Sequence, residues 1–116
     1  MLAETYVLTG QGEKLDAFLK RAQIAVPDDL SPDFTAAQTI IDCNIQLQFA
    51  RAEAYLRNYL SQPVEGLEPT MAVAHWRLGQ VLEKEGRRTT ALSEVQTVVN
   101  LDPSLDGARK DIKRLQ

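Results

Sequence analysis

Apolar residues recur along most of this chain at intervals of three and four positions, the spacing that places them on one face of an α-helix. No stretch alternates polar and apolar residues long enough to indicate a β-strand. The pattern predicts an all-α fold, with helices at about residues 2–9, 12–26, 32–46, 49–61, 69–85, 88–100 and 105–115.

Glycine and proline residues indicate where several of these helices begin and end. Gly86 stands at the end of one helix, where a left-handed backbone conformation is expected. Pro103 ends the next helix because it has no N–H group. Ser31 and Pro32 are typical of an N-cap followed by proline in the first turn, and residues 62–69 form the clearest loop.

One segment carries a more specific pattern than helical periodicity. Small residues at Gly79 and Ala91 would let two antiparallel helices approach closely. Large residues and a proline accompany them at fixed intervals: Leu78, Leu82, Val95 and Pro103. This combination resembles the tetratricopeptide repeat, a 34-residue helical hairpin with the pattern W-x2-L-G-x2-Y, A-x3-F and P. His75, Leu82 and Val95 stand in place of its aromatic residues.

The resemblance extends over nearly the whole chain as one repeat domain. We expect three repeats and a capping helix, at about residues 1–28, 33–66, 72–105 and 105–115. In the middle repeat, Ile40 occupies the glycine slot and Cys43 occupies a core-facing slot. The first repeat begins late, so we expect it to be truncated and the chain to be part of a longer protein.

The family implies helix-turn-helix repeats stacked in a right-handed superhelix, an α-solenoid whose first helices line a concave groove. Such grooves hold a peptide or helix of another protein, so we expect a non-catalytic protein- or peptide-binding scaffold. In this register the expected peptide-binding residues are Trp76, Arg77, Gln80, Gln38, Ile41, Asn44 and Ile45.

Two of these residues have alternative interpretations. Trp76 either packs in the core, one place away from the family's tryptophan slot, or stands in the groove as an aromatic anchor. Arg77 matches one residue of the carboxylate clamp found in some members of the family. Val73 and Gln38 occupy two other clamp slots, which argues against that binding mode.

No group of residues in the sequence indicates an enzyme, a metal site or a cofactor. His75 is the only histidine and Cys43 the only cysteine, and nothing in the sequence pairs them. We expect His75 to be a packed or half-buried residue. The carboxylates are scattered at helix ends, without the paired arrangement that acid–base hydrolysis needs.

Charge and hydropathy narrow the class of partner. A formal charge of −3 gives no reason to expect nucleic acid, and the basic residues at 87–88 and 110–114 are interpreted as solvated helix ends. No run of 18 apolar residues is present, so we expect no membrane insertion. The compartment stays open: a soluble cytoplasmic location is slightly favoured over a periplasmic or membrane-tethered one.

A second hypothesis comes from the N-terminal helix. If the first repeat is truncated, apolar residues Met1, Leu2, Tyr6 and Leu8 lack the helix that would cover them. The chain would then be a self-association module that forms a homodimer through this helix.

Overall fold

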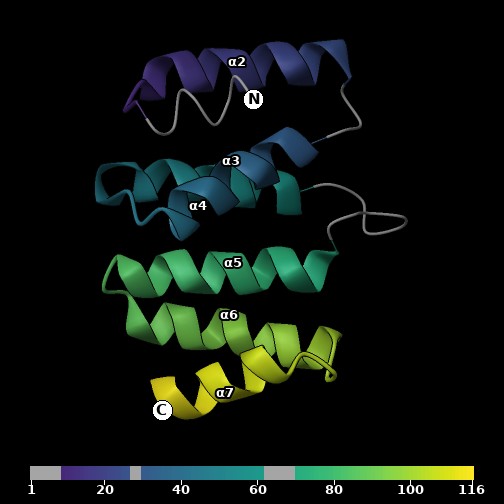
Figure 1. Ribbon diagram of the computed structural model, residues 1–116. Helices are drawn as coiled ribbons and strands as arrows, with labels where there is room; N and C mark the ends of the chain where they lie inside the picture. Colours follow the sequence, from purple (N-terminus) through teal and green to yellow (C-terminus); the bar gives the residue numbers. More distant parts are fainter. Residues whose placement is uncertain (1–8, 27–29, 62–69) are drawn as a thin grey trace.

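The computed structural model describes residues 9–26, 30–61 and 70–116, and every regular element in these segments is helical. The elements are α2 (Gly12–Ala25), α3 (Ser31–Asp42), the 3₁₀ helix η1 (Gln46–Gln48), α4 (Phe49–Leu60), α5 (Met71–Lys84), α6 (Arg88–Leu101) and α7 (Asp106–Leu115). They lie one beyond another in chain order, from α2 at one end to α7 at the other (Figure 1). The predicted all-α fold is therefore confirmed for these segments. The helix expected at residues 2–9 and the loop at 62–69 lie outside them.

The α5–α6 hairpin is closely packed, and small residues at its centre make this possible. A Cβ atom on Gly79 would lie 2.9 Å from Val95 Cγ2 and 3.5 Å from the Ala91 carbonyl oxygen. Ala91 itself is fully buried, and so are Leu82 and Val98. The close approach predicted for Gly79 and Ala91 is confirmed.

The turn that ends α5 is a Schellman motif. Gly86 has φ +82°, the left-handed conformation expected from the sequence. The Arg87 N–H donates to the Leu82 carbonyl and the Gly86 N–H to the Glu83 carbonyl, each at 2.9 Å. These bonds satisfy carbonyl groups that the helix end leaves unpaired.

The turn that ends α3 uses the same motif without a glycine. Asn44 has φ +54°, the Ile45 N–H donates to the Ile40 carbonyl, and the Asn44 N–H donates to the Ile41 carbonyl, both at 3.1 Å. Asparagine is among the few residues other than glycine that adopt this conformation readily. The predicted helix to residue 46 was therefore wrong, because the chain leaves the helix after Asp42.

The three residues of η1 lengthen the α3–α4 connection relative to the α5–α6 connection and shift the register of α3. Matched by their turns, Ala37 corresponds to Gly79, and Ile40 corresponds to Leu82. Ala37 and Ile40 are both fully buried. The prediction that put Ile40 in the glycine slot and Cys43 in the core was three residues out of register, and Cys43 is exposed.

Helix α2 packs beside α3 and α4 at one end of the stack. Leu15 and Leu19 are buried there. Asp16 accepts a hydrogen bond from the Tyr55 hydroxyl and forms an ion pair with Arg51 at 3.2 Å. Among the described residues, α2 contacts its neighbours much less than α3 to α6 contact one another.

Helix α7 packs against α6 at the opposite end. Ala108 and Leu115 are buried, and Leu105 and Ile112 are partly buried against the core. Within the described segments, no helix is long and apolar enough to cross a membrane.

Candidate binding groove

A groove of about 510 Å³ runs across α3, α5 and α7, the first helix of each successive hairpin and the helix that follows them. Its walls are mostly polar or charged side chains: Ile41, Asp42, Arg77, Gln80, Glu83, Lys84, Asp111 and Arg114. Three of these residues are acidic and three are basic, so their formal charges balance.

At one end of the groove, Arg77 connects α5 with α3. Its Nη1 donates to Asp42 Oδ1 at 2.9 Å and to Gln80 Oε1 at 3.0 Å. The Arg77 side chain is 22% exposed, whereas that of Asp42 is 53% exposed. An ion pair with so exposed a partner is weak, which leaves Arg77 able to exchange Asp42 for a group on a ligand.

Lys84 lies one helical turn beyond Gln80 in α5 and also lines the groove. Its Nζ donates to Asn44 Oδ1 at 3.0 Å and lies 6.0 Å from the centre of the Phe49 ring. These contacts leave Lys84 without a carboxylate partner among the described residues. Asn44 thus both forms the turn after α3 and holds a groove cation.

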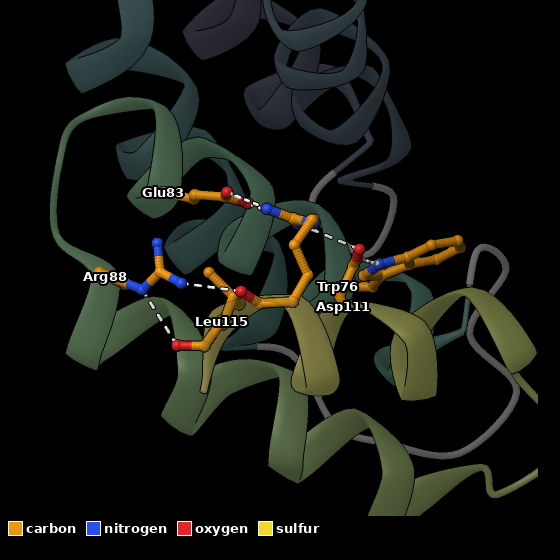
Figure 2. Close-up of polar contacts among 6 residues, drawn as sticks. Trp76, Glu83, Arg88, Asp111 and Leu115 are labelled. Atoms are coloured by element: carbon orange, nitrogen blue, oxygen red, sulfur yellow. Dashed lines mark hydrogen bonds and ion pairs between the residues drawn. The ribbon is translucent and has the colours of Figure 1, made fainter.

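The α7 side of the groove is a network of polar contacts between α5, α6 and α7 (Figure 2), and Arg114 makes three of these contacts. The Arg114 guanidinium donates to both carboxylate oxygens of Glu83, and its Nη2 donates to Asp111 Oδ1 at 3.1 Å. Hydrogen bonding from Arg114 lowers the pKa of Glu83, because the guanidinium group favours the ionised carboxylate. The other oxygen of Asp111 accepts from Trp76 Nε1 at 2.8 Å.

Trp76 is partly buried and faces α7, and its side chain does not line the groove. The Trp76 ring packs directly against Gly107: a Cβ atom built on Gly107 would lie only 2.6 Å from Trp76 Cζ2. Its one polar atom is already bonded to Asp111. Of the two interpretations of Trp76, packing within the protein therefore fits its surroundings better than service as a free anchor.

The structure brings three of the seven predicted site residues into the groove: Ile41, Arg77 and Gln80. Ile41 is only 4% exposed and forms part of the floor. Asn44 does not line the groove itself, but its side chain accepts a hydrogen bond from the lining residue Lys84. Ile45 packs against the core after the turn. Gln38 is half-buried on α3, one helical turn before Ile41 and Asp42, but it does not line the groove.

Sequence reasoning missed Asp42, Glu83, Asp111 and Arg114. Asp42 was missed because the predicted register of α3 was three residues out. Aligning Asn44 with Gly86 places Asp42 at the position of the groove residue Lys84. Arg114 belongs to the basic residues interpreted as a solvated helix end, and Asp111 stands in the same segment. Their partners lie 31 and 35 positions away in the chain, which no local pattern reveals.

The remaining candidates for chemistry lie apart from the groove. His75 is half-buried as predicted, and its Nδ1 lies 2.7 Å from Glu94 Oε2. Cys43 is exposed at the end of α3. Across residues 9–26, 30–61 and 70–116, no three histidine, cysteine or acidic residues gather in a way that could hold a metal ion.

A second cavity of about 380 Å³ lies between α2, α3 and α4. Asp33 is buried on its wall, and its Oδ2 accepts from Asn58 Nδ2 at 2.9 Å. Burial raises the pKa of Asp33, although the hydrogen bond from Asn58 works against this shift. Asp16 on the same wall forms an ion pair with Arg51 and accepts a hydrogen bond from the Tyr55 hydroxyl.

Comparison with known proteins adds no family or relative to this picture. The chain matches no protein-family model, no curated protein and no solved structure at a significant level.

Proposed function

We propose that this chain is a non-catalytic scaffold of tetratricopeptide type, which holds a segment of another protein in the groove formed by α3, α5 and α7. The proposal rests first on the two complete hairpins. Each has small, buried residues at corresponding positions, Gly79 and Ala91 in one hairpin and Ala37 and Ala52 in the other. Each hairpin also has a left-handed residue after its first helix.

The observation that carries the proposal is the position of the groove. Its lining comes only from the first helix of each hairpin and from α7, so stacking creates a continuous surface that no single hairpin could provide. A right-handed superhelical path of the hairpins follows from the proposed family and is part of this proposal.

The lining also indicates the chemistry of the segment. Apart from Ile41, the groove offers guanidinium, ammonium, amide and carboxylate groups. A polar segment with charged side chains suits these groups better than one that depends on a large apolar anchor. Exchange of weak internal ion pairs for pairs with the ligand would make such binding reversible.

The test is to select binders from a displayed random peptide library and measure their affinity by calorimetry. We expect Arg77→Ala and Gln80→Ala to weaken the binding of a selected peptide by about tenfold each, because each removes side-chain contacts at the groove centre. Arg109→Ala is the matched control, since Arg109 is exposed on α7 outside the lining.

Backbone amide shifts recorded with the peptide should map to α3, α5 and α7. Equal affinity for the wild type and both groove variants, or shifts confined to the α4 and α6 side, would contradict the proposal. Selection of no peptide at all would equally count against it.

A further inference from the structure

The geometry points to α7 as a detachable wall of the groove, so that docking of α7 and occupation of the groove favour each other. This inference rests on the proposed function for its ligand, but the docking itself is a property of the free protein. Asp111 and Arg114 belong to α7, and without them the groove would keep only its α3 and α5 sides.

Apolar burial holds α7 only lightly. Two of its residues, Ala108 and Leu115, are buried, and one of these is only a methyl group. Helix α5 buries Ala72, Ala74, Leu78, Gly79, Val81 and Leu82 by comparison. Because hydrophobic stabilisation scales with the apolar area buried, apolar contacts hold α7 less firmly than they hold α5.

Polar contacts fasten the helix instead (Figure 2). Trp76 and Glu83, both from α5, hold Asp111 and Arg114. From α6, Arg88 donates to the carbonyls of Arg114 at 2.7 Å and Leu115 at 3.0 Å, which caps the end of α7. Arg114 is 52% exposed and Glu83 31% exposed, so salt should weaken this fastening.

The contact between Trp76 and Gly107 adds a steric requirement. With α7 docked, the indole ring occupies the space beside the Gly107 Cα atom, 2.6 Å from where a Cβ atom would stand. A side chain at position 107 would push the ring away from its hydrogen bond with Asp111.

Undocking would also unfold α7. It has 10 residues, and an isolated helix of that length is marginal in water. The open state would therefore free Trp76 and Glu83 and remove one wall of the groove in a single step. A ligand that contacts both α5 and α7 binds the docked state preferentially, and by linkage it stabilises docking to the same extent.

Hydrogen exchange of the full chain without ligand tests the docking. We expect Trp76→Phe and Glu83→Gln to speed exchange of the amides of residues 110–115 by about three- to tenfold each, the range for one lost hydrogen bond or exposed ion pair. Amides of α5 and α6 should keep their wild-type rates. Arg109→Gln and Lys113→Gln, which change exposed residues of the same helix, are the controls.

Gly107→Ala provides an independent variant. Alanine raises intrinsic helix propensity, so faster exchange in α7 would identify the collision with Trp76 as the cause. Raising NaCl from about 0.1 M to about 1 M, which shortens the screening length from about 10 Å to about 3 Å, should speed α7 exchange in the wild type and less in Glu83→Gln.

Unchanged α7 exchange in all three variants would overturn the inference, and so would equal acceleration in α5, α6 and α7, since α7 would then open only with the whole fold. Adding a selected groove peptide at about 100 times its Kd should slow α7 exchange by up to about a hundredfold, the limit reached when the peptide binds only the docked state. Tight binding in the groove with no such slowing would refute the coupling while leaving the proposed function intact.

Discussion

At the scale of single residues, two positions with left-handed backbone define the ends of α3 and α5. Gly86 meets this demand without a side chain, and Asn44 meets it with one of the few side chains that tolerate it. Asn44 also accepts a hydrogen bond from Lys84, so the same residue shapes the turn and the edge of the groove.

Replacing either residue with alanine should therefore destabilise the protein. We expect Gly86→Ala and Asn44→Ala each to lower the free energy of unfolding by about 1 to 2 kcal/mol, because alanine tolerates the left-handed conformation less well than glycine or asparagine. Asn44→Gly is the control, because it keeps the conformation while removing the side chain. Urea unfolding measures all three, and a loss in Asn44→Gly as large as in Asn44→Ala would assign the effect to the hydrogen bond with Lys84.

A pair of carboxylates where α4 meets the α5–α6 turn gives a pH-dependent prediction. Glu53 accepts from Arg57 and Arg87, each at 2.9 Å. Burial alone would raise the pKa of Glu53, but these arginines and a bond from Glu85 lower it. Burial raises the pKa of Glu85, and the neighbouring Glu53 raises it further.

Because the pKa of Glu85 is higher in the folded than in the unfolded protein, ionising Glu85 costs stability. This cost is absent below the unfolded pKa, grows between the unfolded and folded values, and is complete above the folded one. We expect Glu85→Gln to be more stable than the wild type at pH 7 and equal to it at acid pH. Thermal unfolding across pH measures the difference, and a gain that persists unchanged in acid would contradict the assignment.

At the scale of elements, the two hairpins reach the same packing with different small residues. Gly79 on α5 faces Val95 and Ala91 on α6, while Ala37 on α3 fills the corresponding place in the first hairpin. The first hairpin can accept a methyl group there, whereas the second has no room for one without a shift of Val95.

Gly79→Ala should therefore destabilise the protein even though alanine is the better helix former. We expect a loss of about 1 to 3 kcal/mol from overpacking, reduced by about 1 kcal/mol of helix propensity. In the background of Val95→Ala the same substitution should cost less, because the methyl group it collides with is gone. Equal costs in the two backgrounds would show that the contact between Gly79 and Val95 does not limit the packing.

At the scale of the whole molecule, the described helices form a stack with a well-packed middle and lighter ends. Polar contacts join the two hairpins, with Arg77 to Asp42 and Arg87 to Glu53 both at 2.9 Å. Helix α2 and helix α7 each have a neighbouring helix on one side only among the described residues (Figure 1).

Stability should therefore fall from the middle of the stack towards its ends. We expect amides of α3 to α6 to exchange only with global unfolding, and those of α2 and α7 to exchange through smaller openings. Native-state hydrogen exchange in low concentrations of denaturant measures this gradient. A single opening free energy shared by all six α-helices of the described segments would contradict it.

The sequence by itself determined the positions of most helices, the close approach of Gly79 to Ala91 and the turn at Gly86. These features depend on periodicity and on backbone restrictions, which act between residues near each other in the chain. The turn at Asn44 escaped this reasoning, because asparagine is compatible with both a continuing helix and a left-handed end.

Only the tertiary structure decided what surrounds the groove. Trp76 faces α7 and bonds to Asp111, and Arg114 bonds to Glu83 of α5, although the segment that contains Asp111 and Arg114 was expected to be a solvated helix end. Such pairings depend on how far each hairpin is rotated and displaced against the next. In the first hairpin, the three residues of η1 also shift α3 by three positions relative to α4, compared with the second hairpin. Side chains more than 30 positions apart meet through packing of the whole stack, and no local pattern in the sequence encodes that geometry.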